Sequence, residues 1–150
     1  ADFIRHQSKV EADAGKEVFR KVVNISSIAG TAGNAGQANY SAGKAGIIGL
    51  TKALSKEWGR YKVNVNAVAF GFIKTRLTEA TADGNASIDV EGRKIKVGVN
   101  PELMAMMERS IPVGRAGTPE EAAGSVYLLC TPESNYVSGQ VLICGGGVSI

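Results

Sequence analysis

Two residues of this sequence, Tyr40 and Lys44, could together form an acid–base centre. They stand four positions apart in a segment of helical character, so both side chains would project from one face of a helix. A tyrosine hydroxyl, with an ordinary pKa of about 10, exchanges protons poorly near neutral pH unless a nearby positive charge favours its phenolate. Lys44 would supply that charge, which makes Tyr40 a candidate general acid or base.

A third candidate, Ser27, follows a short apolar segment over residues 21–25 that predicts a buried parallel strand. Open α/β sheets place their ligand crevice at the carboxyl ends of their strands, so a hydroxyl there could hydrogen-bond a substrate oxygen. Ser26 stands beside it and is the alternative for this role. Each residue alone is commonplace, and only the combination points to chemistry.

The elements that must position these residues alternate between strand and helix. The strand over residues 21–25 precedes an amphipathic helix over residues 39–60, which we expect Gly59 to end. Residues 63–68 and 141–143 predict two further buried strands. Strands linked by crossover helices are typical of an α/β, doubly wound parallel sheet with flanking helices.

The connection over residues 76–117 is longer than usual, and we interpret it as a substrate loop. Within it, residues 87–99 predict a hairpin around Glu91-Gly92, and residues 103–109 predict a short helix. Three methionines on this helix would either pack ordinarily or form a wall for an apolar substrate tail. They are Met104, Met106 and Met107.

Three shorter signals complete the pattern. Residues 9–20 read as the end of a helix that runs into a polar loop. Thr118-Pro119-Glu120-Glu121 combines a capping box with proline at the first helical position, so a helix should run to about Leu129. Gly145-Gly146-Gly147 predicts a tight turn after the last strand.

Composition excludes several function classes. The chain has 150 residues, 44% hydrophobic and 21% charged, as expected for a soluble globular domain. Its 17 basic and 14 acidic residues are spread without a Lys/Arg run, so we predict no nucleic-acid partner and no membrane surface. No apolar stretch approaches the roughly 18 residues that span a bilayer, and no signal peptide is visible, so we expect a cytoplasmic protein.

No metal site is predicted. His6 is the only histidine, which removes the usual metal ligand and general base unless His6 itself serves. Cys130 and Cys144 lack a CxxC motif or a Cys/His cluster, so we expect two buried thiols rather than a disulfide or zinc site.

Taken together, the motifs resemble the short-chain dehydrogenase/reductase family, and most closely its branch of 3-oxoacyl-(acyl-carrier-protein) reductases. The resemblance rests on residues 24–27, 40–46 and 63–68 and extends from about residue 20 to residue 147. It implies a Rossmann-like fold, in which residues 1–150 would be the catalytic C-terminal part of one domain, without its dinucleotide-binding N-terminal part.

The resemblance also implies roles for the candidate residues. Tyr40 would protonate a carbonyl oxygen as hydride arrives from nicotinamide, and Lys44 would assist it and hydrogen-bond the nicotinamide ribose. Ser27, rather than Ser26, would hold the substrate oxygen, because its distance from Tyr40 in the sequence matches the family spacing. The loop after the second strand would hold the nicotinamide carboxamide. Its cofactor-binding residues would be Gly71, Ile73 and Thr75.

The sequence departs from the family pattern at several points. Phe70 stands where the family has proline. The glycine-rich turn that binds the pyrophosphate is missing, and residues 30–36, although glycine-rich, belong to the substrate side. The residue that selects the cofactor is also missing, so we expect NADP or NAD. Asn24 lies within a strand and does not match the family's catalytic asparagine.

Three strands alone would leave residues 21–25 with an unpaired apolar edge, which natural proteins avoid or cover. We therefore expect more sheet beside them, from residues upstream of Ala1 or from a second chain. The family resemblance implies a homo-oligomer, either a dimer or a tetramer, in which the long helix packs against its copy.

Two functions remain open at this level. The first is an NAD(P)-dependent oxidoreductase acting on a ketone or secondary alcohol, with a 3-oxoacyl or 3-hydroxyacyl thioester as the substrate. The alternative is an inactive truncated fragment that serves as a binding or assembly module, because the pyrophosphate anchor is missing.

Overall fold

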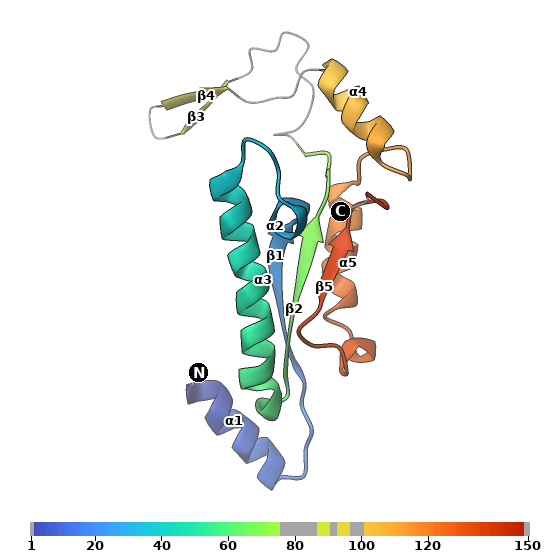
Figure 1. The fold of residues 1–150 in the computed structure, drawn as a ribbon. Coiled ribbons are helices and arrows are strands. Elements are labelled where there is room, and N and C mark those ends of the chain that lie inside the picture. Colours follow the sequence, from blue (N-terminus) through green and yellow to red (C-terminus); the bar gives the residue numbers. More distant parts are fainter. Residues whose placement is uncertain (1, 76–86, 91–92, 97–100, 149–150) are drawn as a thin grey trace.

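The computed structural model describes residues 2–75, 87–90, 93–96 and 101–148, and places helices on both faces of a parallel sheet (Figure 1). The sheet has the strand order β1-β2-β5. Both neighbouring pairs, β1 with β2 and β2 with β5, run parallel. The predicted α/β architecture is confirmed. Its strands are β1 (Arg20–Ser27), β2 (Val63–Phe70) and β5 (Val141–Cys144).

The central strand β2 is the buried core of the fold. Every residue from Val63 to Ala69 is buried. A strand covered on both faces needs small or branched apolar side chains, and Val65, Ala67 and Val68 are 0% exposed. Two asparagines interrupt this apolar run.

Those asparagines bind the chain that precedes β5. The Nδ2 group of Asn66 donates to the Val137 carbonyl at 2.9 Å, and its Oδ1 accepts from the Gln140 amide at 3.0 Å. The Nδ2 group of Asn64 donates to the Asn135 carbonyl at 3.1 Å. Since buried polar groups need partners, these bonds both satisfy the asparagines and position β5.

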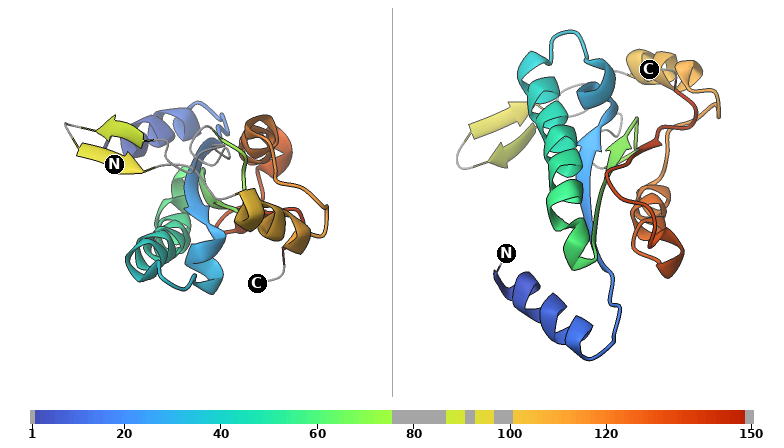
Figure 2. Two further views of the ribbon diagram at one scale, coloured as in Figure 1. Left: turned by 90° about the horizontal axis from the view of Figure 1, so that it is seen from above. Right: turned by 60° about the horizontal axis from the view of Figure 1, so that its bottom comes forward.

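The long helix α3 (Ala38–Trp58) crosses from β1 to β2 on the sheet face opposite α5 (Pro119–Leu128), as Figure 2 shows. The prediction that Gly59 ends this helix is confirmed, because the helix runs to Trp58 and Gly59 is its C-cap. Gly59 has a right-handed φ of −55° and begins a short 3-10 turn, η1 (Gly59–Tyr61). The chain reverses at Lys62, whose φ of 57° lies in the left-handed region and whose amide donates to the Gly59 carbonyl.

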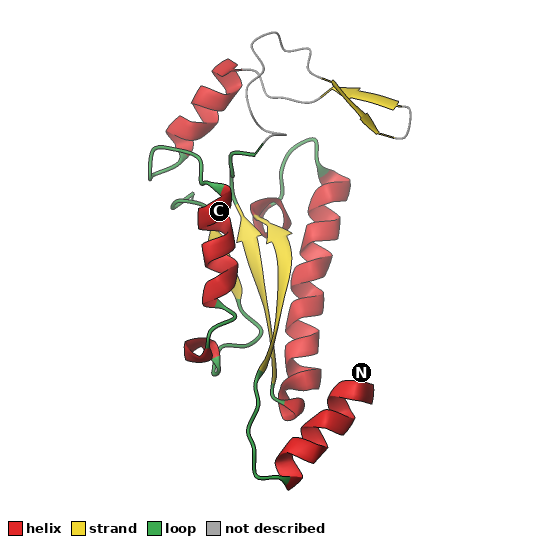
Figure 3. Cartoon of the chain, turned by 180° about the vertical axis from the view of Figure 1, so that it is seen from behind, coloured by secondary structure: helices red, strands yellow, loops and turns green. Residues whose placement is uncertain are grey.

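The predicted capping box at the start of α5 is confirmed. Thr118 Oγ1 accepts from the Glu121 amide at 3.2 Å, and Glu121 Oε2 accepts from the Thr118 amide at 2.9 Å. The helix then runs past β2 and β5 to the short turn η2 (Pro132–Ser134), seen from behind in Figure 3. The glycine turn after β5 has left-handed φ values at Gly146 and Gly147.

Parts of the predicted substrate loop are described. The hairpin is confirmed as β3 (Ser87–Val90) pairing antiparallel with β4 (Arg93–Lys96), and residues 91–92 and 97–99 lie outside the described residues. The short helix is α4 (Pro101–Ser110). Met106 and Met107 are exposed on it.

The first helix, α1 (Asp2–Asp13), ends within residues 9–20 and runs into a loop, as predicted, although Arg20 already belongs to β1. The Arg20 guanidinium donates to both Glu11 carboxylate oxygens, which ties α1 to the sheet and lowers the pKa of Glu11. None of the described helices is both long and apolar enough to cross a membrane. The prediction of two buried thiols is wrong, because Cys130 is exposed and Cys144 is half-buried.

The asparagine bonds of β2 give a stability test. Asn66→Ala should lower the free energy of unfolding by about 2 kcal/mol, because it removes both hydrogen bonds of a buried side chain and leaves the Gln140 amide and the Val137 carbonyl without that partner. Chemical denaturation would measure this loss. Asn34→Ala is the matched control, since Asn34 makes one exposed side-chain bond to Gln37. An Asn66→Ala variant as stable as the control would contradict the assignment.

Candidate active site

Tyr40 and Lys44 lie on the first turns of α3, which begins at the carboxyl edge of the sheet (Figure 1). A crossover helix runs opposite to its strands, so its N-terminus comes back to the edge where β1 ends. The Lys44 ammonium nitrogen lies 5.6 Å from the centre of the Tyr40 ring. This distance is within the range of a cation–π contact, so the structure brings the two residues together.

The surroundings of this pair leave it available for chemistry. Tyr40 is 46% exposed, so its hydroxyl can reach a ligand. The Lys44 ammonium donates to the Ile25 carbonyl at 3.2 Å. Within the described part of the chain it has no carboxylate partner, so its positive charge is not neutralised by an ion pair.

Ser27 and Ser26 have different environments. Ser27 is the last residue of β1 and caps the short helix α2 (Ile28–Ala32), because its Oγ accepts from the Ala29 amide at 3.2 Å. That bond does not use the hydroxyl hydrogen of Ser27, which remains available to a ligand. The Ser26 hydroxyl is buried and donates to the Lys44 carbonyl at 2.9 Å.

These environments favour Ser27 over Ser26 as the residue that meets a substrate. No hydrogen bond joins Ser27 to Tyr40 among the residues that the structure describes. Hydrogen bonds between catalytic groups often tighten only when a ligand binds, so this geometry is compatible with a shared ligand oxygen.

The predicted cofactor loop begins beside Ser27, because Ser27 pairs with Phe70 across the sheet. Gly71 donates its amide hydrogen to the Cys144 carbonyl at 2.9 Å. A Cβ atom at Gly71 would lie 2.8 Å from the Gly145 Cα, so only glycine fits there. This close approach brings the loop after β2 against the glycine turn after β5.

The next residues of the loop are held by the chain that precedes α5. Ile73 and Gly117 form a parallel bridge, with the Gly117 amide donating to the Phe72 carbonyl at 3.0 Å and the Lys74 amide donating to the Gly117 carbonyl at 2.8 Å. Thr75 is exposed. The backbone of the predicted carboxamide site is thus held in place by bonds that do not involve its side chains.

Comparison with known proteins agrees with this geometry. The sequence profile of a family described as enoyl-(acyl carrier protein) reductase matches residues 3–149. The chain belongs to the short-chain dehydrogenase/reductase family.

Similar members of the short-chain dehydrogenase/reductase family are bacterial 3-oxoacyl-[acyl-carrier-protein] reductases FabG. The protein of Chlamydia muridarum is 42% identical over 128 residues, covering 85% of this chain and 44% of the relative. That of Aquifex aeolicus is 40% identical over 133 residues, covering 89% and 46%. That of Thermotoga maritima is 41% identical over 129 residues, covering 86% and 45%. The chain spans less than half the length of these relatives.

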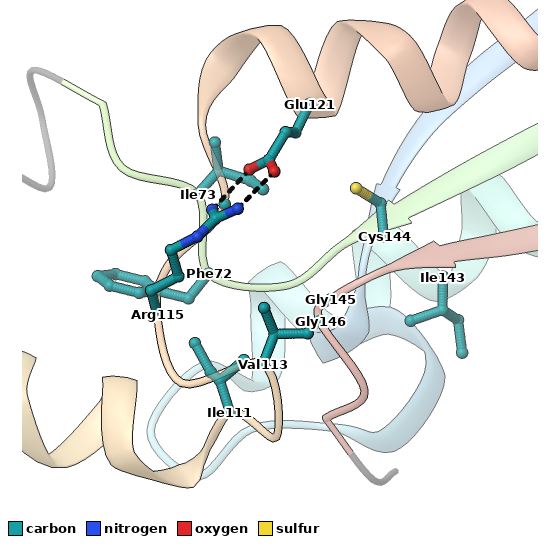
Figure 4. A pocket seen from close by; sticks show the side chains of 11 residues that line it. Phe72, Ile73, Ile111, Val113, Arg115, Glu121, Ile143, Cys144, Gly145 and Gly146 are labelled. Atoms are coloured by element: carbon teal, nitrogen blue, oxygen red, sulfur yellow. Dashed lines mark hydrogen bonds and ion pairs between the residues drawn. The ribbon is translucent and has the colours of Figure 1, made fainter.

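The structure of this short-chain dehydrogenase/reductase chain also contains a pocket of about 240 Å³ that the sequence did not predict (Figure 4). It lies beyond the ends of β2 and β5, where Cys144 pairs with Phe70 in the sheet. Its lining is largely apolar, with one ion pair. The lining side chains include Phe72, Ile73, Ile111, Val113, Ile143 and Cys144.

The ion pair in this pocket joins Arg115 to Glu121 through two bonds of 2.7 and 2.8 Å (Figure 4). The Arg115 guanidinium, together with the Thr118 backbone amide, lowers the pKa of the Glu121 carboxyl to about 2. The capping-box pattern identified Glu121 as a helix cap, but no local spacing rule pairs it with a residue six positions earlier. Among the described residues, no three His, Cys, Asp or Glu side chains gather as metal ligands.

This pair predicts a pH dependence of stability. A carboxyl whose pKa is lower in the folded chain stabilises the fold above its unfolded pKa, and this contribution is lost as the pH falls from about 4.5 toward 2. Glu121→Gln should therefore flatten the decline of melting temperature in this window. Thermal unfolding between pH 6 and pH 2.5 would measure it, with the neighbouring Glu120→Gln as control. Equal slopes in both variants would contradict the assignment.

Proposed function

We propose that Tyr40, Lys44 and Ser27 form the acid–base centre of an NAD(P)-dependent oxidoreductase that interconverts 3-oxoacyl and 3-hydroxyacyl thioesters. The observation that carries this proposal is the 5.6 Å separation between the Lys44 ammonium and the Tyr40 ring, at the carboxyl edge of a parallel sheet. Ligands of open α/β sheets bind at that edge.

The residues present fit the nicotinamide end of such a cofactor. The Lys44 ammonium faces a carbonyl oxygen at 3.2 Å, so it can donate further hydrogen bonds to ribose hydroxyls. Gly71 has no side chain, and its backbone approaches Gly145 closely, which keeps the loop over residues 71–75 compact beside Ser27. We assign Gly71, Ile73 and Thr75 to the carboxamide.

The chemistry of the site follows from its hydroxyl groups. When bound, the cofactor supplies or accepts hydride. In the reductive direction, the Tyr40 hydroxyl gives its proton to the carbonyl oxygen, and Lys44 stabilises the negative charge that remains on the phenol oxygen. The Ser27 hydroxyl donates a hydrogen bond to the same substrate oxygen and orients it.

The substrate class rests on this donor set and on the relatives. The family profile is described by an enoyl reduction, which acts on a carbon–carbon double bond, whereas the similar FabG proteins are named for reduction of a 3-oxo group. A carbonyl oxygen is the group that two hydroxyl donors at the carboxyl edge of the sheet, Tyr40 and Ser27, would recognise. The 3-oxoacyl thioester is therefore the substrate that we propose.

Several further assignments belong to this proposal. Residues 76–117 would form the substrate loop. Among the described strands β1 pairs only with β2, so its other edge can accept a further strand that brings a pyrophosphate-binding turn. Either NADP or NAD would serve, and self-association would follow the family. No observation specifically supports the alternative function, an inactive fragment that serves as a binding or assembly module.

The test of this function uses Tyr40→Phe, which removes one oxygen. Turnover with a 3-oxoacyl thioester and NADPH should fall by about 10²- to 10⁴-fold, because the proton donor is lost. Cofactor binding and melting temperature should stay near the parent values, because the ring remains. Steady-state kinetics and NADPH fluorescence would measure both, and retained turnover would rule out the role of Tyr40.

Lys44→Ala separates the two roles given to that residue. It should reduce turnover and also weaken NADPH binding, since the ammonium is assigned to both the phenol and the ribose. Lys52→Ala, on the same helix but without a contact to Tyr40 in the described structure, is the matched control. Unchanged NADPH affinity in Lys44→Ala would contradict the ribose assignment.

A further inference from the structure

Two side chains of β1 form hydrogen bonds to α3. The Asn24 Nδ2 group donates to Thr51 Oγ1 at 2.9 Å, and the Ser26 hydroxyl donates to the Lys44 carbonyl at 2.9 Å. Asn24 and Ser26 stand two apart on the strand and so point to the same face. Thr51 and Lys44 stand seven apart on the helix, which is about two turns. The two bonds therefore act at two separate heights along α3.

The bond from Ser26, which is the one nearer the N-terminus of α3, is almost completely shielded from water. Ser26 is 2% exposed, so losing its bond would leave a polar group without solvent to replace the partner. This carbonyl is the backbone carbonyl of Lys44 itself, the proposed catalytic lysine. Ser26 thus contacts the site through the backbone rather than through a ligand.

The helix α2 packs closely against the backbone of Lys44 through Gly30. A Cβ atom at Gly30 would lie 2.6 Å from the Lys44 carbonyl carbon and 2.7 Å from the Lys44 Cβ, so no larger residue fits. The Lys44 side chain also bonds back to the Ile25 carbonyl. Backbone and side chain of Lys44 are therefore both held by neighbouring residues of β1, Ile25 and Ser26.

We infer that Ser26 is a positioning residue, whose hydroxyl sets the height of the α3 turn that carries Tyr40 and Lys44 relative to Ser27 at the end of β1. The catalytic consequence rests on the proposed function. Groups that act on one substrate oxygen need placement to within about 0.5 Å, and a misplacement of about 1 Å can reduce rates 10²-fold. One buried bond to Lys44 is thus enough to affect the rate.

The test compares Ser26→Ala with Thr51→Val in the full chain. Each variant removes one buried hydroxyl from the interface between β1 and α3, and Thr51 is 0% exposed. Both should therefore lower the melting temperature. Only Ser26→Ala should reduce kcat, by about tenfold or more, with the KM for the 3-oxoacyl thioester within about twofold of the parent.

Hydrogen–deuterium exchange supplies a readout that needs neither cofactor nor activity. Ser26→Ala should speed exchange of the backbone amides in residues 40–48, whereas Thr51→Val should speed it lower on the helix, in residues 49–55. Ser26→Cys, which keeps the volume but donates only weakly, should show the Ser26→Ala pattern to a smaller extent and serves if Ser26→Ala does not fold.

The outcomes separate this inference from the proposed function. A parent chain that neither binds NADPH nor turns over contradicts the proposed function, and the exchange pattern then decides whether Ser26 holds the turn. If the Ser26 and Thr51 variants accelerate the same amides equally, the inference is overturned. If the exchange pattern is as expected and kcat falls only in Ser26→Ala, the inference is supported.

Discussion

The burial of β2 between β1 and β5 is the constraint on which the rest of the structure depends. A strand that is covered on both faces and paired on both edges fixes the register of its neighbours, so Ser27, Phe70 and Cys144 lie in one row at the carboxyl edge. The crossover from β1 to β2 must then begin at that edge, which places the start of α3 beside Ser27. The position of Tyr40 and Lys44 follows from the topology of the sheet.

Burial alone does not specify the height of a helix along a strand, because apolar contacts are not directional. Hydrogen bonds from buried polar side chains supply this direction. Ser26 and Asn24 bind α3 at two levels, and Asn66 binds the segment before β5. Polar residues within these otherwise apolar strands thus determine where the neighbouring elements lie along the strands, and so position the candidate site.

Much of the fold could be predicted because its signals are local. The strand runs, the capping box at Thr118 and the Tyr-x-x-x-Lys pair all lie within a few residues of their partners. What the sequence missed depends on the folded chain. The chain turns through a left-handed conformation at Lys62, Arg115 pairs with Glu121 where a loop meets a helix, and Gly30 is needed only because Lys44 packs against it.

The most direct test of the proposed acid–base centre is the fate of a labelled hydride. The full chain would be incubated with a 3-oxoacyl thioester and NADPH carrying deuterium at the transferable C4 position, and the product would be identified by mass spectrometry. The account predicts a 3-hydroxyacyl thioester with deuterium on C3, formed at least about 10²-fold more slowly by the Tyr40→Phe variant. The account would be contradicted if the parent chain transferred no deuterium to the 3-oxoacyl thioester. It would also be contradicted if, in a parallel incubation, the chain reduced only an enoyl thioester to a saturated product.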